Sequence, residues 1–169
     1  MKLAAAVHLK DDVAWAAAVT FDEWDAREAL RTVTSRIDGL EKPAPGELDL
    51  REAAALAQLL GRHGLQPDTI VIDGPVHIDA AETPGWGRAL FDALGGRIPI
   101  IGISAAALRG LPAQFEVHRE EEGRPVLVTC AGLDLGAAKA RVRTMHGKRR
   151  MPTLLKLAAR TARDAADPA

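Results

Sequence analysis

Residues 48–77 read LDLREAAALAQLLGRHGLQPDTIVIDGPVH, and this stretch predicts a helix, a turn and a buried strand in succession. The predicted helix covers residues 51–63, which are mostly small or apolar, and Gly64 ends it. Residues 69–72 are almost wholly apolar, and a run without polar alternation is typical of a strand covered on both faces. The stretch therefore predicts one unit of an α/β sheet, with Asp73-Gly74 turning the chain away at the strand's carboxyl end.

Two acids of this stretch are candidate metal ligands. In open α/β sheets, ligands gather outside the carboxyl ends of the strands, which is where Asp73 stands. Glu52 lies in the first turn of the preceding helix, and paired carboxylates suit a divalent cation. Two simpler interpretations stay open: Glu52 stabilises a helix start through the helix dipole, and Asp73-Gly74 is only a turn.

Composition narrows the class of protein. The 169 residues predict one domain over residues 1–163 and a disordered tail over 164–169. The net charge of −1 gives the chain as a whole no strong attraction to nucleic acid. The single cysteine, Cys130, excludes a disulfide framework, and no stretch reaches membrane-spanning length, so we expect a soluble cytoplasmic protein.

The remaining elements predict an α/β fold of the ribonuclease-H-like class, with a mixed β-sheet flanked by helices. Apolar runs around the turn at Lys10-Asp11-Asp12 predict a hairpin, and alternation predicts a third antiparallel strand. Helices and strands then alternate, as expected for a βαβ arrangement. The expected strands are 2–8, 13–21, 27–37, 69–72, 98–103, 113–118 and 125–130, with a charged turn at 119–124 joining the last two; the expected helices are 51–63, 85–94, a short turn at 105–108, 133–142 and 153–162.

Five motifs in order resemble the endonuclease V family, especially its shorter bacterial branch, over most of the chain. They are Pro45-Gly46-Glu47-Leu48-Asp49-Leu50-Arg51-Glu52, Ile70-Val71-Ile72-Asp73-Gly74, Pro84-Gly85-Trp86-Gly87 with Leu90, Ile98-Pro99-Ile100-Ile101-Gly102-Ile103, and Met145-His146-Gly147 followed by Arg150-Met151-Pro152-Thr153-Leu154-Leu155-Lys156. The resemblance implies a metal-dependent nuclease that cuts DNA or RNA near deaminated bases, chiefly inosine. It implies Glu52 and Asp73 as two ligands of Mg²⁺ or Mn²⁺.

His8 stands where the family has an aspartate in its first strand. An imidazole could still bind Mn²⁺, which makes His8 a third candidate ligand and catalytic residue with Glu52 and Asp73. The alternative is a hydrogen-bonded core histidine. A site with two carboxylates and a neutral imidazole is expected to bind a metal weakly, since it supplies less negative charge.

Two other segments supply candidate substrate contacts. His77 and Asp79 lie in the loop after Asp73, where the family approaches its substrate. His146, Arg149 and Arg150 belong to the most concentrated basic run of the sequence and could contact phosphates. A solvated loop and a solvated charged surface are the simpler interpretations.

Several positions depart from the family pattern. Besides His8, the lysine expected after the Ile-Gly strand is replaced by Ala105, residues 157–159 contain no acid or histidine, and residues 43–45 contain no wedge aromatic. Two hypotheses follow. In the first, the chain is an endonuclease-V-like protein with weakened or lost cleavage. In the second, it is a catalytically inactive module on the same fold that binds nucleic acid or protein.

Overall fold

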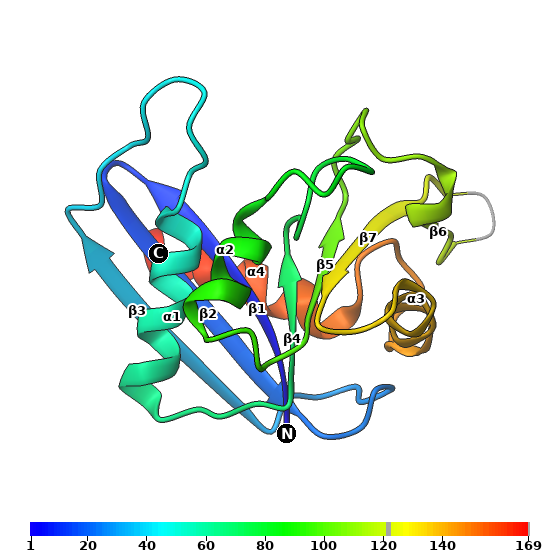
Figure 1. Cartoon of the computed structure of the whole chain (residues 1–169). Helices are drawn as coiled ribbons and strands as arrows, with labels where there is room; N and C mark the ends of the chain where they lie inside the picture. Colours follow the sequence, from blue (N-terminus) through cyan, green and yellow to red (C-terminus); the bar gives the residue numbers. More distant parts are fainter. Residues whose placement is uncertain (121–122, 169) are drawn as a thin grey trace.

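Seven strands form one mixed sheet in the computed structural model, which describes residues 1–120 and 123–168 (Figure 1). The strands lie in the order β3-β2-β1-β4-β5-β7-β6. Their bounds are β1 (Lys2–Lys10), β2 (Val13–Phe21), β3 (Arg31–Asp38), β4 (Thr69–Asp73), β5 (Ile100–Ser104), β6 (Glu116–Val117) and β7 (Val126–Ala131). β1 pairs in parallel with β4, and β4 with β5, whereas every other neighbouring pair is antiparallel. The predicted ribonuclease-H-like α/β class is confirmed.

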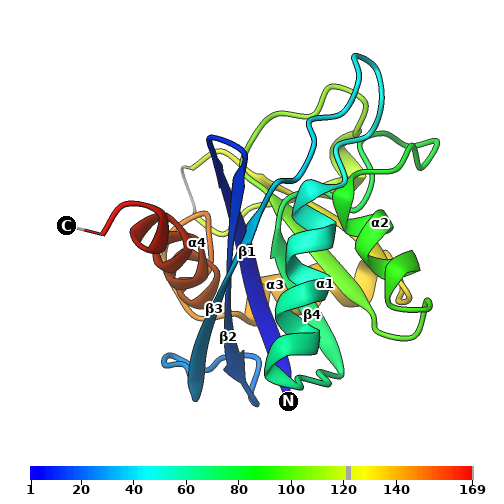
Figure 2. The ribbon, with the colours of Figure 1, turned by 90° about the vertical axis from the view of Figure 1, so that its left-hand side faces the viewer.

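Helices cover both faces of the sheet, as Figure 2 shows. α1 (Arg51–His63) and α2 (Trp86–Ala93) pack on one face, and α3 (Leu135–Thr144) and α4 (Thr153–Ala166) pack on the other. The sheet thus separates two apolar cores, one under each pair of helices. Among the helices of residues 1–120 and 123–168, none combines the length and apolar character that crossing a membrane requires.

The sequence explains where these helices lie. Ala55, Leu56 and Leu59 of α1 are fully buried, because positions three and four apart lie on one face of a helix. Gly64 ends α1 in the left-handed conformation, with a φ of 60°. Asp134 begins α3, where its carboxylate accepts a hydrogen bond from the Ala137 amide.

Two predicted strands were too long. β3 begins at Arg31 rather than residue 27, since residues 22–30 form a loop in which Leu30 is 68% exposed. The predicted strand 113–118 is only two residues of β6, preceded by the short 3₁₀ helix η1 (Ala113–Phe115). Phe115, the last residue of η1, is buried in a small apolar cluster with Leu111 and Leu127.

Two further predicted features differ from the structure: a short helical turn and the end of the last helix. Residues 105–108 are not helical, and the Ala105 carbonyl accepts a hydrogen bond from Arg150 in place of a helical amide. α4 continues to Ala166, so it takes in the first residues of the segment predicted as a tail; Asp167, just beyond it, pairs with Lys10 of β1. Of the predicted turn 119–124 and the predicted tail, residues 121–122 and 169 lie outside the described residues.

Side chains from the last turn of α1 cover the outer edge of β3. The Arg62 guanidinium donates to the Ser35 hydroxyl at 3.1 Å and to the Arg36 carbonyl at 3.4 Å. The His63 ring nitrogen Nε2 donates to the Thr34 carbonyl at 3.0 Å. The end of α1 is thereby fixed to the end strand of the sheet.

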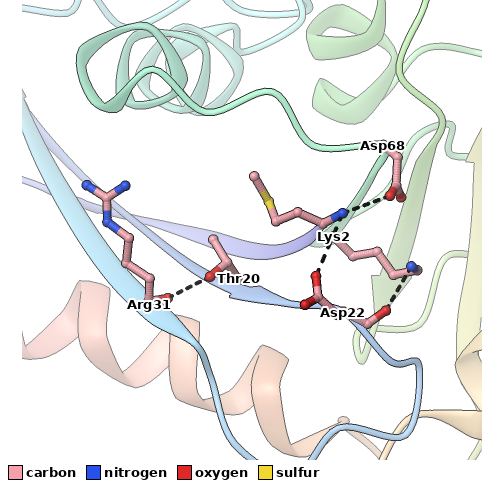
Figure 3. Close-up of polar contacts among 6 residues, drawn as sticks. Lys2, Thr20, Asp22, Arg31 and Asp68 are labelled. Atoms are coloured by element: carbon pink, nitrogen blue, oxygen red, sulfur yellow. Dashed lines mark hydrogen bonds and ion pairs between the residues drawn. The ribbon is translucent and has the colours of Figure 1, made fainter.

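A polar cluster at the start of β1 joins this strand to two neighbouring segments (Figure 3). The amino group of Met1 donates to the Asp68 carboxylate at 3.0 Å and lies 3.8 Å from that of Asp22. The Lys2 side chain donates to the Asp22 carbonyl at 2.9 Å. These contacts fix the start of β1 against the loop after β2 and the turn before β4.

Candidate functional site

The loops that follow β3, β4 and β5 gather at one end of the sheet (Figure 1). Asp73 is the last residue of β4, and Gly74 turns the chain with a φ of 155°. A side chain at Gly74 would meet the indole of Trp86, whose Nε1 would lie 2.3 Å from the added Cβ. Both the backbone and the packed indole therefore require glycine directly after Asp73.

Asp73 opens into a hollow of about 310 Å³ on the α4 side of the sheet, which we call the Asp73 hollow. Its other lining residues come from α4 and the segment before it: Met151, Leu155, Lys156, Ala159, Arg160 and Arg163. Burial raises the pKa of the Asp73 carboxyl above its ordinary value, and the positive charge of Arg163 opposes this rise. Asp73 thus faces a cationic helix.

Glu52 opens into a different hollow of about 520 Å³, on the face of the sheet covered by α1 and α2. We call it the apolar hollow, because most of its wall is made of apolar side chains: Leu48, Pro75, Ile78, Pro84 and Trp86. Burial raises the pKa of Glu52 to about 7, and the negative charges of Asp49 and Asp73 add to this rise against the opposing Arg51. The site therefore favours the neutral form of the Glu52 carboxyl more than solvent does.

His8 lies on β1 beyond the stretch that pairs with β4, which ends at Ala5 opposite Ile72. Its partner in the hairpin is Trp15. Within residues 1–120 and 123–168, no group of three or more histidine, cysteine, aspartate or glutamate side chains is placed to hold a metal ion. His8, Glu52 and Asp73 accordingly do not form a three-ligand site in this structure.

His77 and Asp79 shape the loop beside the apolar hollow. His77 is buried, its ring meets Phe115 edge-on at 5.9 Å between centroids, and its Nδ1 atom has no hydrogen-bond partner in the described structure. The Asp79 carboxylate accepts hydrogen bonds from the Thr83 amide at 3.0 Å and hydroxyl at 2.6 Å, which lowers the Asp79 pKa. These contacts stabilise the turn between Asp79 and Thr83. Ile78 and Thr83 also line the apolar hollow.

The predicted basic run divides into internal and surface residues. His146 Nδ1 lies 3.0 Å from the Thr153 hydroxyl at the start of α4. The Arg150 guanidinium donates to three carbonyl oxygens, those of Ala105, Arg124 and Pro125, each at 2.9 Å. Arg150 therefore fastens loops together, whereas Arg149 is exposed.

Arg149 belongs to a hollow of about 650 Å³ between the start of α4 and the loop before β3, which we call the basic hollow. Its cations are Arg27, Lys148, Arg149, Lys156 and Arg160, and among the described residues Glu28 is the one acid that lines it. Lys156 and Arg160 line this hollow and the Asp73 hollow alike, so the two form one cationic surface along α4. Sequence reasoning missed Arg27, Lys156, Arg160 and Arg163, although the spacing from 156 to 160 to 163 already placed three cations on one helix face.

These residues do not fit the divalent metal site that the family resemblance implies. Mg²⁺ and Mn²⁺ require several oxygen or nitrogen ligands around one point, whereas Glu52 and Asp73 open into different hollows. The positive charge of Arg163 also acts on Asp73, and Lys156 and Arg160 line the same hollow, which disfavours an added cation there.

No family model matches the chain, and no curated protein matches it by sequence. Solved structures of endonuclease V match it across nearly its full length at low identity. Endonuclease V of Bacillus subtilis aligns with a TM-score of 0.75 and 16% identity, covering 98% of this chain and 80% of the other. Ciona intestinalis endonuclease V, crystallised as a variant with a 23mer DNA containing an inosine followed by a ribo-adenosine, gives 0.74 and 16%, covering 97% and 83%. Streptomyces avermitilis endonuclease V gives 0.69 and 23%, covering 97% and 77%. The motif resemblance is therefore confirmed at the level of the fold.

Proposed function

We propose that this chain binds a nucleic-acid strand, taking an unstacked base into the apolar hollow and the phosphates onto the cationic surface of α4. We further propose that metal-dependent cleavage has been lost or nearly lost. The protein would then be an endonuclease-V-like binder of DNA or RNA, with inosine as the first base to test. The inosine DNA in the Ciona structure motivates that choice.

The proposal rests on the placement of the hollows. The apolar hollow and the Asp73 hollow share no lining residue, but the negative charge of Asp73 is close enough to contribute to the raised pKa of Glu52. A nucleobase needs apolar walls for its faces and a polar group for its edge. Trp86 and Pro75 supply the walls, and the Glu52 carboxyl, with its pKa of about 7, supplies a group that can donate or accept a hydrogen bond.

Phosphate binding has its own support. Lys148, Arg149, Lys156 and Arg160 are all exposed, and together with Arg27 they outnumber Glu28, the acid found among the described residues that line the basic hollow. Contacts of lysine and arginine with phosphates supply most of the sequence-independent affinity for nucleic acid. The cationic surface is local, because the chain as a whole has a net charge of −1.

A second candidate function is weak Mn²⁺-dependent cleavage with Glu52, Asp73 and His8 as ligands. It is favoured by one observation: burial raises the pKa of both carboxyls, and among the residues that the structure describes neither has an ion-pair partner of the kind that Asp49 finds in Arg51. A cation between Glu52 and Asp73 would relieve their mutual repulsion. Two observations argue against this candidate function. His8 lies beyond the part of β1 that pairs with β4, and the arginines of α4 line the Asp73 hollow.

Fluorescence anisotropy with labelled single-stranded DNA and RNA tests the proposed function. Binding should weaken steeply between about 50 and 200 mM salt. Arg160→Ala should weaken it and reduce the salt slope by about one, whereas Arg143→Ala, an exposed arginine on α3 outside the hollows, should change neither. Equal loss in both variants, or no binding, would refute the interface.

The same strands, with one inosine or with guanosine in its place, distinguish the two candidates. Incubation in Mg²⁺ and in Mn²⁺ should leave them uncut. Cleavage that disappears in both Glu52→Gln and Asp73→Asn would instead establish the nuclease. Cleavage that survives both changes would come from a contaminant.

A further inference from the structure

The Asp73 hollow contains three cations and one acid. Lys156, Arg160 and Arg163 come from one face of α4, and their spacing of four and three residues keeps them together. All three are exposed, whereas Asp73 is partly buried at the floor. At neutral pH the ionised side chains that line this hollow carry a net positive charge.

The hollow already contains the positive charge that a nuclease of this fold would obtain from a metal. In a carboxylate site, a bound divalent cation supplies the positive charge that attracts and polarises the phosphate. Here the positive charges are part of α4, and the charge of Arg163 already acts on the Asp73 carboxyl across the hollow. The remaining two cations, Lys156 and Arg160, also line the basic hollow, so one nucleic-acid strand can contact both the Asp73 hollow and the basic hollow.

We propose that Lys156, Arg160 and Arg163 hold a phosphodiester directly beside Asp73 without any divalent cation, and that the Asp73 carboxylate limits this binding. This inference rests on the proposed function, and it assigns the contacted group as a backbone phosphate. For a substitution of Asp73, it predicts a change in binding affinity opposite to the change expected of a metal site. Removing the charge of Asp73 strengthens binding, whereas in a metal site the same change would remove a ligand and weaken it.

Anisotropy titrations of a labelled single-stranded DNA, at one fixed ionic strength, provide the test. The wild-type dissociation constant should be the same within about twofold in EDTA and in Mg²⁺, because no phosphate contact requires the metal. Asp73→Asn should tighten binding about fivefold, and Arg163→Ala should weaken it about fivefold, as expected for one charge near a phosphate in water. A thermal melt of each variant checks that it is folded.

Matched controls separate the local effect from net charge. Asp92→Asn removes an exposed acid from α2, on the other face of the sheet, and Arg143→Ala removes an exposed arginine from α3. Each should change the dissociation constant by less than about twofold, because exposed charges at a distance are screened. Binding that requires Mg²⁺, or that weakens in Asp73→Asn, would overturn this inference while leaving the proposed function intact. Failure of the wild type to bind in either buffer would refute the proposed function itself.

Discussion

Replacing Glu52 by glutamine is expected to stabilise the fold at pH 8 and to leave its stability nearly unchanged at pH 4. The folded protein holds the Glu52 proton up to a pKa of about 7, because burial and the nearby acids disfavour the charge. The unfolded chain releases that proton near 4.5. The free energy of unfolding therefore falls as the pH rises from 4.5 to about 7, and the loss is complete above 7.

The magnitude follows from these two values. Each pH unit between them corresponds to about 1.4 kcal/mol, so ionising Glu52 in the folded protein costs about 3 kcal/mol. Glutamine keeps the shape of the neutral carboxyl and removes this cost. For a domain of this size, Glu52→Gln should raise the midpoint of thermal unfolding by about 6–12 °C at pH 8.

Urea unfolding followed by circular dichroism, from pH 4 to pH 8, measures the effect. The difference between wild type and Glu52→Gln should grow between pH 4.5 and 7 and then stay constant. Glu47→Gln is the matched control, since Glu47 is an exposed acid in the loop before α1. A pH-independent difference, or a variant that is less stable than wild type at pH 8, would contradict the assigned burial of Glu52.

Three further predictions concern the surroundings of the site. Gly102→Ala should destabilise the fold by about 1–3 kcal/mol in urea unfolding, because the new Cβ would lie 2.4 Å from the Gly74 carbonyl oxygen. Arg150→Ala should speed hydrogen exchange of the backbone amides around Ala105 and Arg124, because it removes the hydrogen bonds to the Ala105, Arg124 and Pro125 carbonyls; unchanged exchange would show that other contacts hold these loops. Burial raises the pKa of Cys130 to about 11, so its alkylation rate should increase about tenfold for each unit from pH 8 to 10.

The sequence predicted the parts of the fold whose signals are local. The apolar run of β4 and the glycine that ends α1 each depend on neighbouring residues only, and both were placed correctly. The segments near β6 were not, because Phe115 is drawn into a cluster with Leu111 and Leu127 that the sequence does not reveal. The end of α4 was likewise misjudged, since α4 packs on β1 and β2 and Asp167, just beyond it, pairs with Lys10 of β1.

The candidate site shows the same limit. The positions of Glu52 and Asp73 at a helix start and a strand end were predictable from their neighbours. Whether both open into one cavity depends on which face of the sheet each side chain takes, and this follows only from the assembled structure. The role of Arg150 was equally hidden, because its three carbonyl partners lie at least 25 positions away along the chain.

The contacts of Arg62 and His63 with β3 have a consequence for how copies of this protein meet. An end strand of a sheet can pair with a strand from another molecule through its free carbonyls and amides, and this route leads to aggregation. On β3 the carbonyls of Thr34 and Arg36 already accept hydrogen bonds from α1. An incoming strand would have to displace an arginine and a histidine first, so this edge resists intermolecular β-pairing even in concentrated solution.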